Sequence, residues 1–558
     1  MKIKFCGAAD GVTGSCHLVT ADTDTREVNI LLDCGQFQGG GSIEAQNYKP
    51  FPFSPAEIDF MILSHAHVDH CGRIPLLVKQ GFHGSIYCTD ATADLVSVML
   101  RDSAYIHEKE AEWKSRKALR AGKSETMPLY TVRDAEASLK HVVPVGYDQL
   151  IEPLPGVKFV LNEAGHIIGS SIIELWTGRG DHNTKLVFSG DLGVVGRPML
   201  RDPKLIKSAD VVIMESTYGN RVHEEGDDSI QKLADILVST VRRGGTVVIP
   251  SFAVGRTQEL IYELNDFYEA NSRYRDALKD VKVYIDSPMA TAATEVFRKN
   301  TQSFDEAFRD KVLSGDDPLD FVNLRFTKST EESKALNDTK EPKIIISASG
   351  MCEAGRIRHH LKHHLWERTS SIVFVGYQGE GTLGRKLLEG AKTVMLFGEE
   401  VTVNAQIHNL EGFSAHADRN GLLAWAKGFR VKPEAFFLVH GELQAKRDLA
   451  ASIRDETGFM PIAVETYSEF KVDGGAARTD ADVMSDIVSP ESIEALRNRI
   501  AGVRKALESV LYKTELAASK ENDPASVSDI SNRLIRLEKE TLGLAASVAE
   551  VPEKDPSP

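Results

Sequence analysis

The sequence predicts an α/β protein in which a module with a mostly parallel sheet is inserted into a first domain. Three observations support this prediction. Residues 1–205 contain strand patterns that run into polar loops, whereas residues 206–397 alternate apolar strands, glycine-bearing loops and helical patterns. Loops with histidines after apolar runs then return over residues 398–470, which we interpret as the second part of an interrupted first domain.

Strand patterns of the first domain end beside residues that can bind metals. The run VNILL at 28–32 directly precedes Asp33, and FMILS at 60–64 directly precedes His65. The run KLVFS at 185–189 is separated from Asp191 by a single glycine. Side chains in such positions are presented at the edge of a sheet, where a ligand can reach them.

The inserted module shows strand patterns with continuous apolar runs at residues 211–214, 246–250, 281–285, 343–346 and 371–375. Continuous apolar strands that alternate with helices are typical of a parallel sheet covered on both faces. Because ligands of such sheets bind at the carboxyl ends of the strands, we expect the loops after these strands to contribute to a binding site.

Residues 471–548 form a C-terminal extension with a different pattern. Apolar residues recur at steps of three and four over residues 493–510 and again over 527–544, with Asn522-Asp523-Pro524 between them. This spacing predicts two helices that fold back as a hairpin. Two interpretations stay open: the hairpin packs on the rest of the chain, or it joins two copies into a homodimer. Residues 549–558 are expected to be a disordered tail.

The composition is that of an ordinary globular protein of 558 residues, long enough for two or three domains. The formal net charge of −15 argues against adhesion to nucleic acid over the whole surface, but it leaves a local basic groove open. No apolar stretch is long enough to span a bilayer, and the amino terminus leads into a strand pattern rather than a secretory signal. The six cysteines occur singly, without a C-x-x-C pair, so we expect a cytoplasmic protein without a membrane partner.

The segment His65-Ala66-His67-Val68-Asp69-His70 carries the strongest chemical signal. Three imidazoles and a carboxylate in one short turn would repel and desolvate one another without a cation, and this mixture of donors suits Zn²⁺. His65 and His67 can converge on one ion while Asp69 and His70 reach a second. The alternative, a coincidental polar loop, is disfavoured by four donors within six positions.

Two further donors lie in glycine-flanked loops. His166 follows Gly165, and Asp191 follows Gly190. A carboxylate beside glycines can be approached from both sides, as a bridging ligand requires. Alone, each residue would be an ordinary loop histidine or turn aspartate, but together with the 65–70 segment they predict a metal site. His223, by contrast, has no partner that the sequence indicates.

These residues occur in the order and setting of the metallo-β-lactamase superfamily, which the sequence resembles. Residues 1–470 as a whole resemble its β-CASP branch, most of all the cleavage-and-polyadenylation endonuclease subunit and its prokaryotic homologues. Glu215 in MESTYG, His416 in GFSAHAD and His440 in LVHGE match three motifs of that branch. The resemblance implies an αββα sandwich from residues 1–205 and 398–470, with a β-CASP domain at 206–397 inserted and a helical C-terminal extension.

The resemblance implies two Zn²⁺ ions per chain. Three histidines bind one ion, two histidines and an aspartate bind the other, and a second aspartate bridges them: His65, His67 and His166; Asp69, His70 and His440; and Asp191. Ions about 3.5–4 Å apart can share a hydroxide and hold the scissile phosphate between them. Asp33 is expected to hold a ligand or the bridging water by a hydrogen bond rather than to bind metal itself.

The resemblance also implies the catalytic residues. His416 protonates the leaving oxygen, Glu215 orients its imidazole and keeps it charged, and Asp69 acts with them at the metal centre. The pairing of Glu215 with His416 follows from the family alone, since a glutamate at a strand end is more often an ordinary capping or salt-bridge residue.

Loops of the inserted module offer a grip for phosphate. Arg256, Arg356 and Arg385 each follow a strand and a small-residue loop near the start of a helix, and Ser347 and Gly350 lie in the loop before Arg356. Backbone amides at helix starts and guanidinium groups both favour phosphate oxygens. Each loop alone is more typical of a tight turn, but together they predict a substrate-binding edge.

The sequence thus predicts a zinc-dependent ribonuclease that hydrolyses phosphodiester bonds of single-stranded RNA and leaves 5′-phosphate and 3′-hydroxyl ends. Histidine in the third motif marks the RNA-processing members of the family, and Phe-Ser-Ala-His in the second favours endonucleolytic cleavage. The alternatives are a 5′–3′ exoribonuclease, a small-molecule hydrolase of thioesters or lactones, and a non-catalytic subunit of RNA processing.

Overall fold

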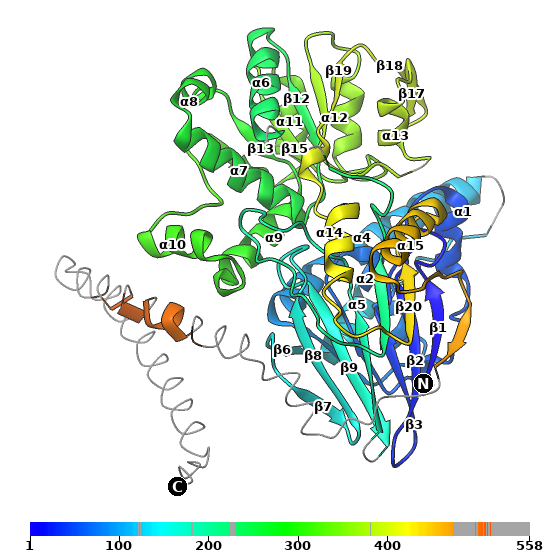
Figure 1. Cartoon of the computed structure of the whole chain (residues 1–558). Coiled ribbons are helices and arrows are strands. Elements are labelled where there is room, and N and C mark those ends of the chain that lie inside the picture. The colour runs from blue at the N-terminus through cyan, green and yellow to red at the C-terminus, as the bar shows by residue number, and fades with distance from the viewer. Residues whose placement is uncertain are drawn as a thin grey trace. The chain divides into compact units, whose positions relative to one another are not determined.

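The computed structural model describes residues 1–120, 122, 124–179, 182–223, 229–379 and 381–472, with scattered residues between 497 and 514. Met1–Val312 and Asp316–Met484 form one compact unit, and Leu313–Gly315 with Ser485–Pro558 form a second. Among its described residues, the first unit builds two seven-stranded sheets, a six-stranded sheet and a two-stranded hairpin, labelled in Figure 1.

The first sheet starts at the amino terminus. Its spatial order is β22 (Glu469–Lys471), β1 (Lys2–Gly7), β2 (Cys16–Asp22), β3 (Glu27–Leu32), β4 (Phe60–Ile62), β5 (Ser85–Thr89) and β6 (Val142–Val145). Neighbours from β22 to β3 are antiparallel, and those from β3 to β6 are parallel. Because β3 and β4 are parallel neighbours, the residues that follow them, Asp33 and the 65–70 turn, meet at one edge.

The second sheet brings distant parts of the chain together. Its order is β21 (Pro461–Ala463), β20 (Ala435–Val439), β11 (Val211–Glu215), β10 (His182–Phe188), β9 (Ser171–Arg179), β8 (Val157–Glu163) and β7 (Ile151–Leu154). Strands β10, β11 and β20 are parallel neighbours. Asp191 after β10, Glu215 at the end of β11 and His440 after β20 therefore reach the same edge.

The two sheets pack face to face and are covered by helices on their outer sides. Alternate strand residues, among them Phe5, Ile30, Phe159 and Phe437, form the core between the sheets. Helices α3 (Ile74–Lys79), α4 (Asp90–Arg120) and α5 (Val132–Ser138) cover the first sheet, and α14 (Arg419–Ala426) and α15 (Leu443–Thr457) cover the second. The result is an αββα sandwich, as the sequence predicts.

The third sheet is parallel throughout. Its order is β14 (Leu324–Phe326), β13 (Val283–Ile285), β15 (Ile344–Ser347), β12 (Val247–Pro250), β16 (Ser371–Phe374) and β19 (Gln406–Asn409). Helices α6 (Ser229–Arg242), α7 (Arg256–Ala270) and α9 (Pro288–Lys299) share a core with one face, and α12 (Ile357–His364) and α13 (Leu383–Leu388) share a core with the other. The expected parallel sheet covered on both faces is present.

The remaining α-helices and strands of the described residues are short. They are α1 (Gly41–Glu44), α2 (Val68–Cys71), α8 (Ser272–Leu278), α10 (Glu306–Ser314), α11 (Thr330–Asp338), β17 (Thr393–Leu396) and β18 (Glu399–Thr402). Helix α2 is a single turn, and it contains the second half of the 65–70 segment.

Two strands belong to different sheets from those that the sequence predicts. The run 211–214 is expected to open the parallel module, but β11 pairs with β10 and β20 in the sandwich. Strand β19 is expected in the second part of the first domain, but it pairs with β16 in the third sheet. A buried parallel strand such as β11 has the same apolar composition in either sheet, and β19, which reads QIHN, is too short and polar for its composition to assign it. The bounds 206 and 397 of the inserted domain stay a prediction.

The C-terminal extension is described in part. The described residues between 497 and 514 are helical, in agreement with the first helix of the expected hairpin. The second helix at 527–544 and the tail at 549–558 lie outside the described residues. Within the described part of the chain, no helix has the length and apolar composition that crossing a bilayer requires.

Candidate metal centre

The 65–70 turn is held by backbone contacts with the loops after β1 and β3. Ser15 N donates to Asp69 O at 2.8 Å, and Cys34 N donates to His70 O at 2.8 Å. Gly35 lies so close to this turn that an added Cβ would stand 1.5 Å from the carbonyl oxygen of Asp69. These contacts fix the turn at the carboxyl end of β4 and direct its donor side chains toward the second sheet.

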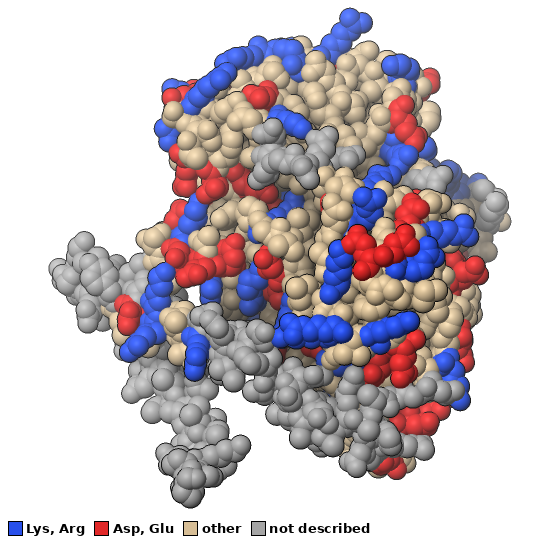
Figure 2. Space-filling model, in the orientation of Figure 1, with Lys and Arg blue, Asp and Glu red and all other residues tan. Residues whose placement is uncertain are grey.

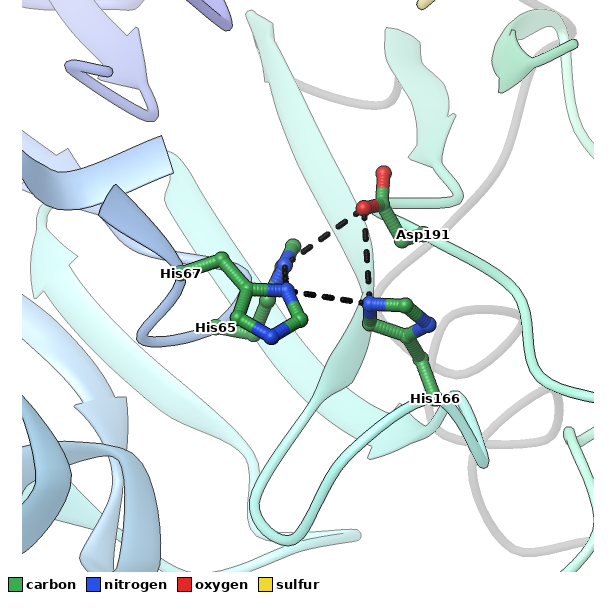
Figure 3. Close-up of side chains that lie close together, drawn as sticks. All are labelled: His65, His67, His166 and Asp191. Carbon is green, nitrogen blue, oxygen red and sulfur yellow. Dashed lines mark hydrogen bonds and ion pairs between the residues drawn. The ribbon is translucent and has the colours of Figure 1, made fainter. Parts of the chain in front are cut away.

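Four donors form a first cluster, drawn in Figure 3. His67 Nδ1 lies 3.1 Å from His65 Nε2 and 3.1 Å from His166 Nε2. Asp191 Oδ2 lies 3.5 Å from His65 Nε2 and 3.6 Å from His166 Nε2. All four donor atoms are within 4.8 Å of one another, the spacing of ligands around one ion.

Asp69, His70 and His440 form a second cluster next to the first. His70 Nε2 lies 3.2 Å from His440 Nε2, and His440 Nε2 lies 3.6 Å from Asp69 Oδ2. Asp191 faces this cluster too, because its Oδ2 is 3.3 Å from His70 Nε2 and its Oδ1 is 3.7 Å from His440 Nδ1. One carboxylate therefore stands between two groups of donors, and a bridging role for Asp191 stays a prediction.

Asp33 lies behind the second cluster. Its carboxylate accepts hydrogen bonds from Ser15 Oγ at 3.0 Å and from Ser64 N and Oγ at 2.8 and 2.9 Å. It also contacts His70 Nδ1 at 2.7 Å, which leaves Nε2 of that ring turned toward Asp191. The backbone of Asp33 has a φ of +59°, a left-handed conformation that aspartate tolerates better than most residues.

The donor set fits divalent metal ions. Burial lowers the pKa of His65 and His166 well below the usual value, so both rings are neutral, the form that binds metal. Burial alone raises the pKa of Asp191, but His440, His70 and His65 outweigh it and hold that pKa well below its usual value. Asp191 Oδ1 is buried without a hydrogen-bond partner, and His67 Nδ1 has two ring nitrogens at 3.1 Å but at most one proton to share with them, so a cation would complete the group.

His416 and Glu215 lie beside the two clusters. His416 Nδ1 is 3.3 Å from Glu215 Oε1 and 3.9 Å from Asp191 Oδ2. Glu215 is fully buried, and it also accepts hydrogen bonds from the backbone N–H groups of Leu192 and Thr217. Burial lowers the pKa of His416, but Glu215 and Asp191 more than offset this and raise it above the usual value.

Comparison with known proteins identifies the family. Residues 22–188 match the metallo-beta-lactamase superfamily domain, residues 257–387 the Beta-Casp domain, and residues 400–466 a Zn-dependent metallo-hydrolase RNA specificity domain. The chain is 38% identical over 442 residues to Ribonuclease TTHA0252 of Thermus thermophilus, covering 79% of this chain and 93% of that protein. The chain belongs to the β-CASP branch of the metallo-β-lactamase superfamily.

Archaeal β-CASP proteins are also similar. The chain is 33% identical over 464 residues to the transcription termination factor FttA of Methanocaldococcus jannaschii, covering 81% of this chain and 69% of FttA. It is 33% identical over 468 residues to FttA of Methanococcus maripaludis, covering 81% and 68%. The family confirms the predicted fold, an αββα sandwich with an inserted β-CASP domain, and the predicted class of enzyme, a hydrolase.

The arginines expected to bind phosphate have different surroundings in the β-CASP domain. Arg356 donates to the buried carboxylate of Asp286 at 2.7 Å. Arg256 is buried in an ion pair with Glu259, and burial lowers the pKa of Arg256 to about 10. Arg385 is partly exposed, with Glu389 at 2.7 Å.

The loop before Arg356 is packed rather than open. Ser347 Oγ is buried and donates to the carbonyl oxygen of Asp286 at 2.9 Å. Gly350 lies against the ring of Phe252, which an added Cβ would meet at 3.0 Å. The structure therefore gives both residues intramolecular contacts, and a role for them in binding substrate stays a prediction.

A cavity of about 300 Å³ lies between the loop after β11 and the loops of the β-CASP sheet. Its lining includes Tyr218, Arg221, Tyr377 and Arg385. The ring centroid of Tyr218 is 6.1 Å from that of His416, so the cavity adjoins the Glu215–His416 pair. Of the three predicted arginines, Arg385 lines this cavity.

Sequence reasoning missed two residues beside the clusters. The ring of Phe252, in the loop after β12, lies 6.5 Å from the ring of His67, centroid to centroid. His223 contacts the backbone of His416 through its Nε2 at 3.0 Å. Phe252 could have been suspected, because it lies just after a parallel strand, at the edge where ligands bind. His223 could not, because its contact with His416 joins residues 193 positions apart in the sequence.

Proposed function

We propose that this protein is a zinc-dependent ribonuclease that cleaves single-stranded RNA internally and leaves 5′-phosphate and 3′-hydroxyl ends. The observation that carries the proposal is the position of Asp191, whose carboxylate lies between two donor clusters and beside His416. With two ions bound, this arrangement would combine a metal centre with a proton donor, both of which assist hydrolysis of a phosphodiester.

The proposed metal ligands follow the two donor clusters described above. One ion would be held by three histidines, the second by two histidines and an aspartate, and both by a shared carboxylate: His65, His67 and His166; Asp69, His70 and His440; and Asp191. When bound, two Zn²⁺ ions supply a strong oxygen nucleophile near neutral pH and neutralise phosphate charge. Asp33 orients His70 by contact with its Nδ1.

His416 is the proposed general acid. With Nδ1 donating to Glu215, the protonated ring has Nε2 available to give its proton to the leaving 3′-oxygen as the P–O bond breaks. The carboxylates of Glu215 and Asp191 raise the pKa of His416, which favours the charged ring that the acid form requires. Glu215, itself fixed by two backbone N–H groups, holds the ring in this orientation.

Single-stranded RNA is the proposed substrate. Similarity to a ribonuclease and to an RNA specificity domain supports this choice. The net charge of −15 does not oppose it, because Lys and Arg are interspersed with Asp and Glu on the face that Figure 2 shows. A strand that enters the cavity beside His416 meets Arg221 and Arg385.

The described cysteines are free and buried, which supports a cytoplasmic location. A homodimer through the C-terminal helices stays a prediction.

The test uses matched RNAs labelled at the 5′ or the 3′ end, cut with and without a chelator. Wild-type protein is expected to give chelator-sensitive internal fragments with 5′-phosphates, and His67→Ala and His416→Ala are expected to lose them. His83→Ala, an exposed histidine, is the matched control. Release of mononucleotides from the 5′ end alone would indicate the exonuclease instead, and hydrolysis of a thioester but not of RNA would indicate the small-molecule hydrolase. Equal cutting by His67→Ala would overturn the proposal.

A further inference from the structure

The segment that carries His416 is held from two sides. Arg197 donates from its guanidinium to the carbonyl oxygens of Gly412 and Ser414. On the other side, His223 contacts the carbonyl oxygen of His416 itself, with its Nε2 at 3.0 Å. The contact is to the backbone of His416, which leaves the imidazole free to meet Glu215.

His223 is itself fixed in place. Its backbone N–H donates to Asp418 Oδ2 at 3.0 Å, and its ring stands edge-on to Tyr218 with centroids 5.1 Å apart. A carbonyl oxygen can only accept a hydrogen bond, so Nε2 of His223 must carry the proton. The side chain of His223 is thus held in place and donates a hydrogen bond to the carbonyl group of His416.

A proposed metal ligand makes the equivalent contact one residue earlier. His166 Nδ1 contacts the carbonyl oxygen of Ala415 at 3.4 Å, and its ring lies 4.4 Å from that of His416. Two consecutive carbonyl groups, those of Ala415 and His416, are therefore held by two histidines. One of these histidines belongs to a donor cluster, and the other, His223, does not.

We propose that His223 is a positioning residue for proton donation by His416. The inference rests on the proposed role of His416 as the general acid. Glu215 sets the direction of the imidazole at Nδ1, and His223 sets the position of the backbone from which the imidazole extends. The proton moves from His416 Nε2 to the leaving 3′-oxygen, and a displacement of the donor by about 1 Å can cost about 10²-fold in rate.

Three substitutions separate the hydrogen bond from mere packing. In His223→Gln the amide nitrogen can reach the position of Nε2, whereas in His223→Asn it reaches only as far as Nδ1, and His223→Ala removes the donor. We expect His223→Gln to keep kcat within about threefold of the wild type, and His223→Asn and His223→Ala to lower it by 10- to 100-fold, about the cost of a displaced reacting group. KM is expected to change by less than about twofold, because the contact is to the enzyme backbone and not to substrate.

A second substrate shows whether substitution of His223 lowers kcat by disturbing proton donation from His416. In RNA with sulfur in place of the bridging 3′-oxygen, the thiolate leaves without a proton, so a general acid is dispensable. On this substrate His416→Ala and His223→Asn are both expected to recover to within a few-fold of the wild-type kcat. A damaged fold would lower kcat on both substrates, and thermal unfolding of each variant checks this directly.

Each outcome decides between the roles. If His416→Ala is equally impaired on both linkages, the general acid has been assigned wrongly and the inference fails together with that assignment. If His416→Ala recovers on the sulfur linkage but His223→Asn does not, His416 remains the acid and His223 does not position it. A rise in KM with kcat unchanged would make His223 a substrate contact of the adjoining cavity, which it also lines, and would overturn the proposal.

Discussion

Two buried aspartates, one in the sandwich and one in the β-CASP domain, have closely similar surroundings. Asp33 directly follows β3, and Asp286 directly follows β13. Each side chain is fully buried, accepts hydrogen bonds from two hydroxyl groups and contacts one histidine nitrogen. The histidine is His70 at 2.7 Å for Asp33 and His360 at 2.6 Å for Asp286.

The difference lies at the second nitrogen of each histidine. Nε2 of His70 faces Asp191 and His440 at 3.3 and 3.2 Å, so it lies among other candidate metal ligands. Nδ1 of His360 instead lies 2.8 Å from the amide oxygen of Asn337, so its hydrogen bond is complete. A carboxylate–histidine pair therefore indicates a metal site only where the far nitrogen meets other ligands.

Removal of the β-CASP carboxylate should have the larger effect on stability. Asp286 also accepts from Arg356, and hydrogen bonds from His360, Ser333 and Thr327 outweigh burial and hold its pKa well below the usual value. Asp286→Ala leaves a buried histidine and an arginine without their anion, so we expect the free energy of unfolding to fall by about 3–5 kcal/mol. Denaturant unfolding measures this, with exposed Asp280→Ala as the control. A loss of zinc from folded Asp286→Ala would contradict the comparison.

Removal of the sandwich carboxylate should instead show in the metal. Asp33→Ala frees Nδ1 of His70, and loss of such an outer partner costs about 10- to 100-fold in metal affinity, or about 1.4–2.7 kcal/mol. Zinc content after dialysis against graded chelator measures the change, and Asp33→Asn, which keeps an acceptor oxygen, should lose less. Unchanged zinc affinity in Asp33→Ala would show that the contact with His70 does not support the metal.

A third carboxyl, that of the mostly buried Glu163, has a pKa that makes stability depend on pH. Glu163 pairs with Arg201 at 3.2 Å, yet burial dominates and raises the pKa of Glu163 to about 7. A carboxyl with a raised folded pKa binds its proton more tightly in the native state, so its stabilisation is present below the unfolded pKa and is lost as pH rises toward 7. Glu163→Gln should match the wild type near pH 5 and exceed it by about 2 kcal/mol near pH 8. If the difference in free energy of unfolding between the two proteins were the same at every pH, this prediction would be wrong.

The sequence was informative where chemistry depends on neighbours along the chain. The segment from His65 to His70, together with Asp33 after its strand, gave residues that the structure brings together, because parallel strands end at one edge. His166 and Asp191 could be predicted as further metal ligands because they lie in glycine-flanked loops. The pairing of Glu215 with His416 could be expected only from the family, since 201 residues separate them.

The sequence was uninformative where a role depends on tertiary partners. Nothing beside Arg356 indicates that its guanidinium meets Asp286, 70 residues away. Strand β11 could not be assigned to a sheet, because a continuous apolar run fits either one, and β19 has no apolar run that could assign it. His223 likewise acquires its role from a contact that no local pattern records.

The prediction with the smallest expected effect compares two arginines that have different surroundings. Arg385 lines the cavity beside His416, whereas Arg256 is buried against Glu259. Arg385→Gln should therefore raise KM for single-stranded RNA a few-fold, about 1 kcal/mol, and lower the slope of log KM against log salt by about one unit. Arg256→Gln should leave KM and the salt slope unchanged while lowering the midpoint of thermal unfolding. If the two variants shift KM and the salt slope alike, RNA must reach Arg256 through a rearrangement that opens its ion pair, and burial in the free protein would not predict which arginines bind substrate.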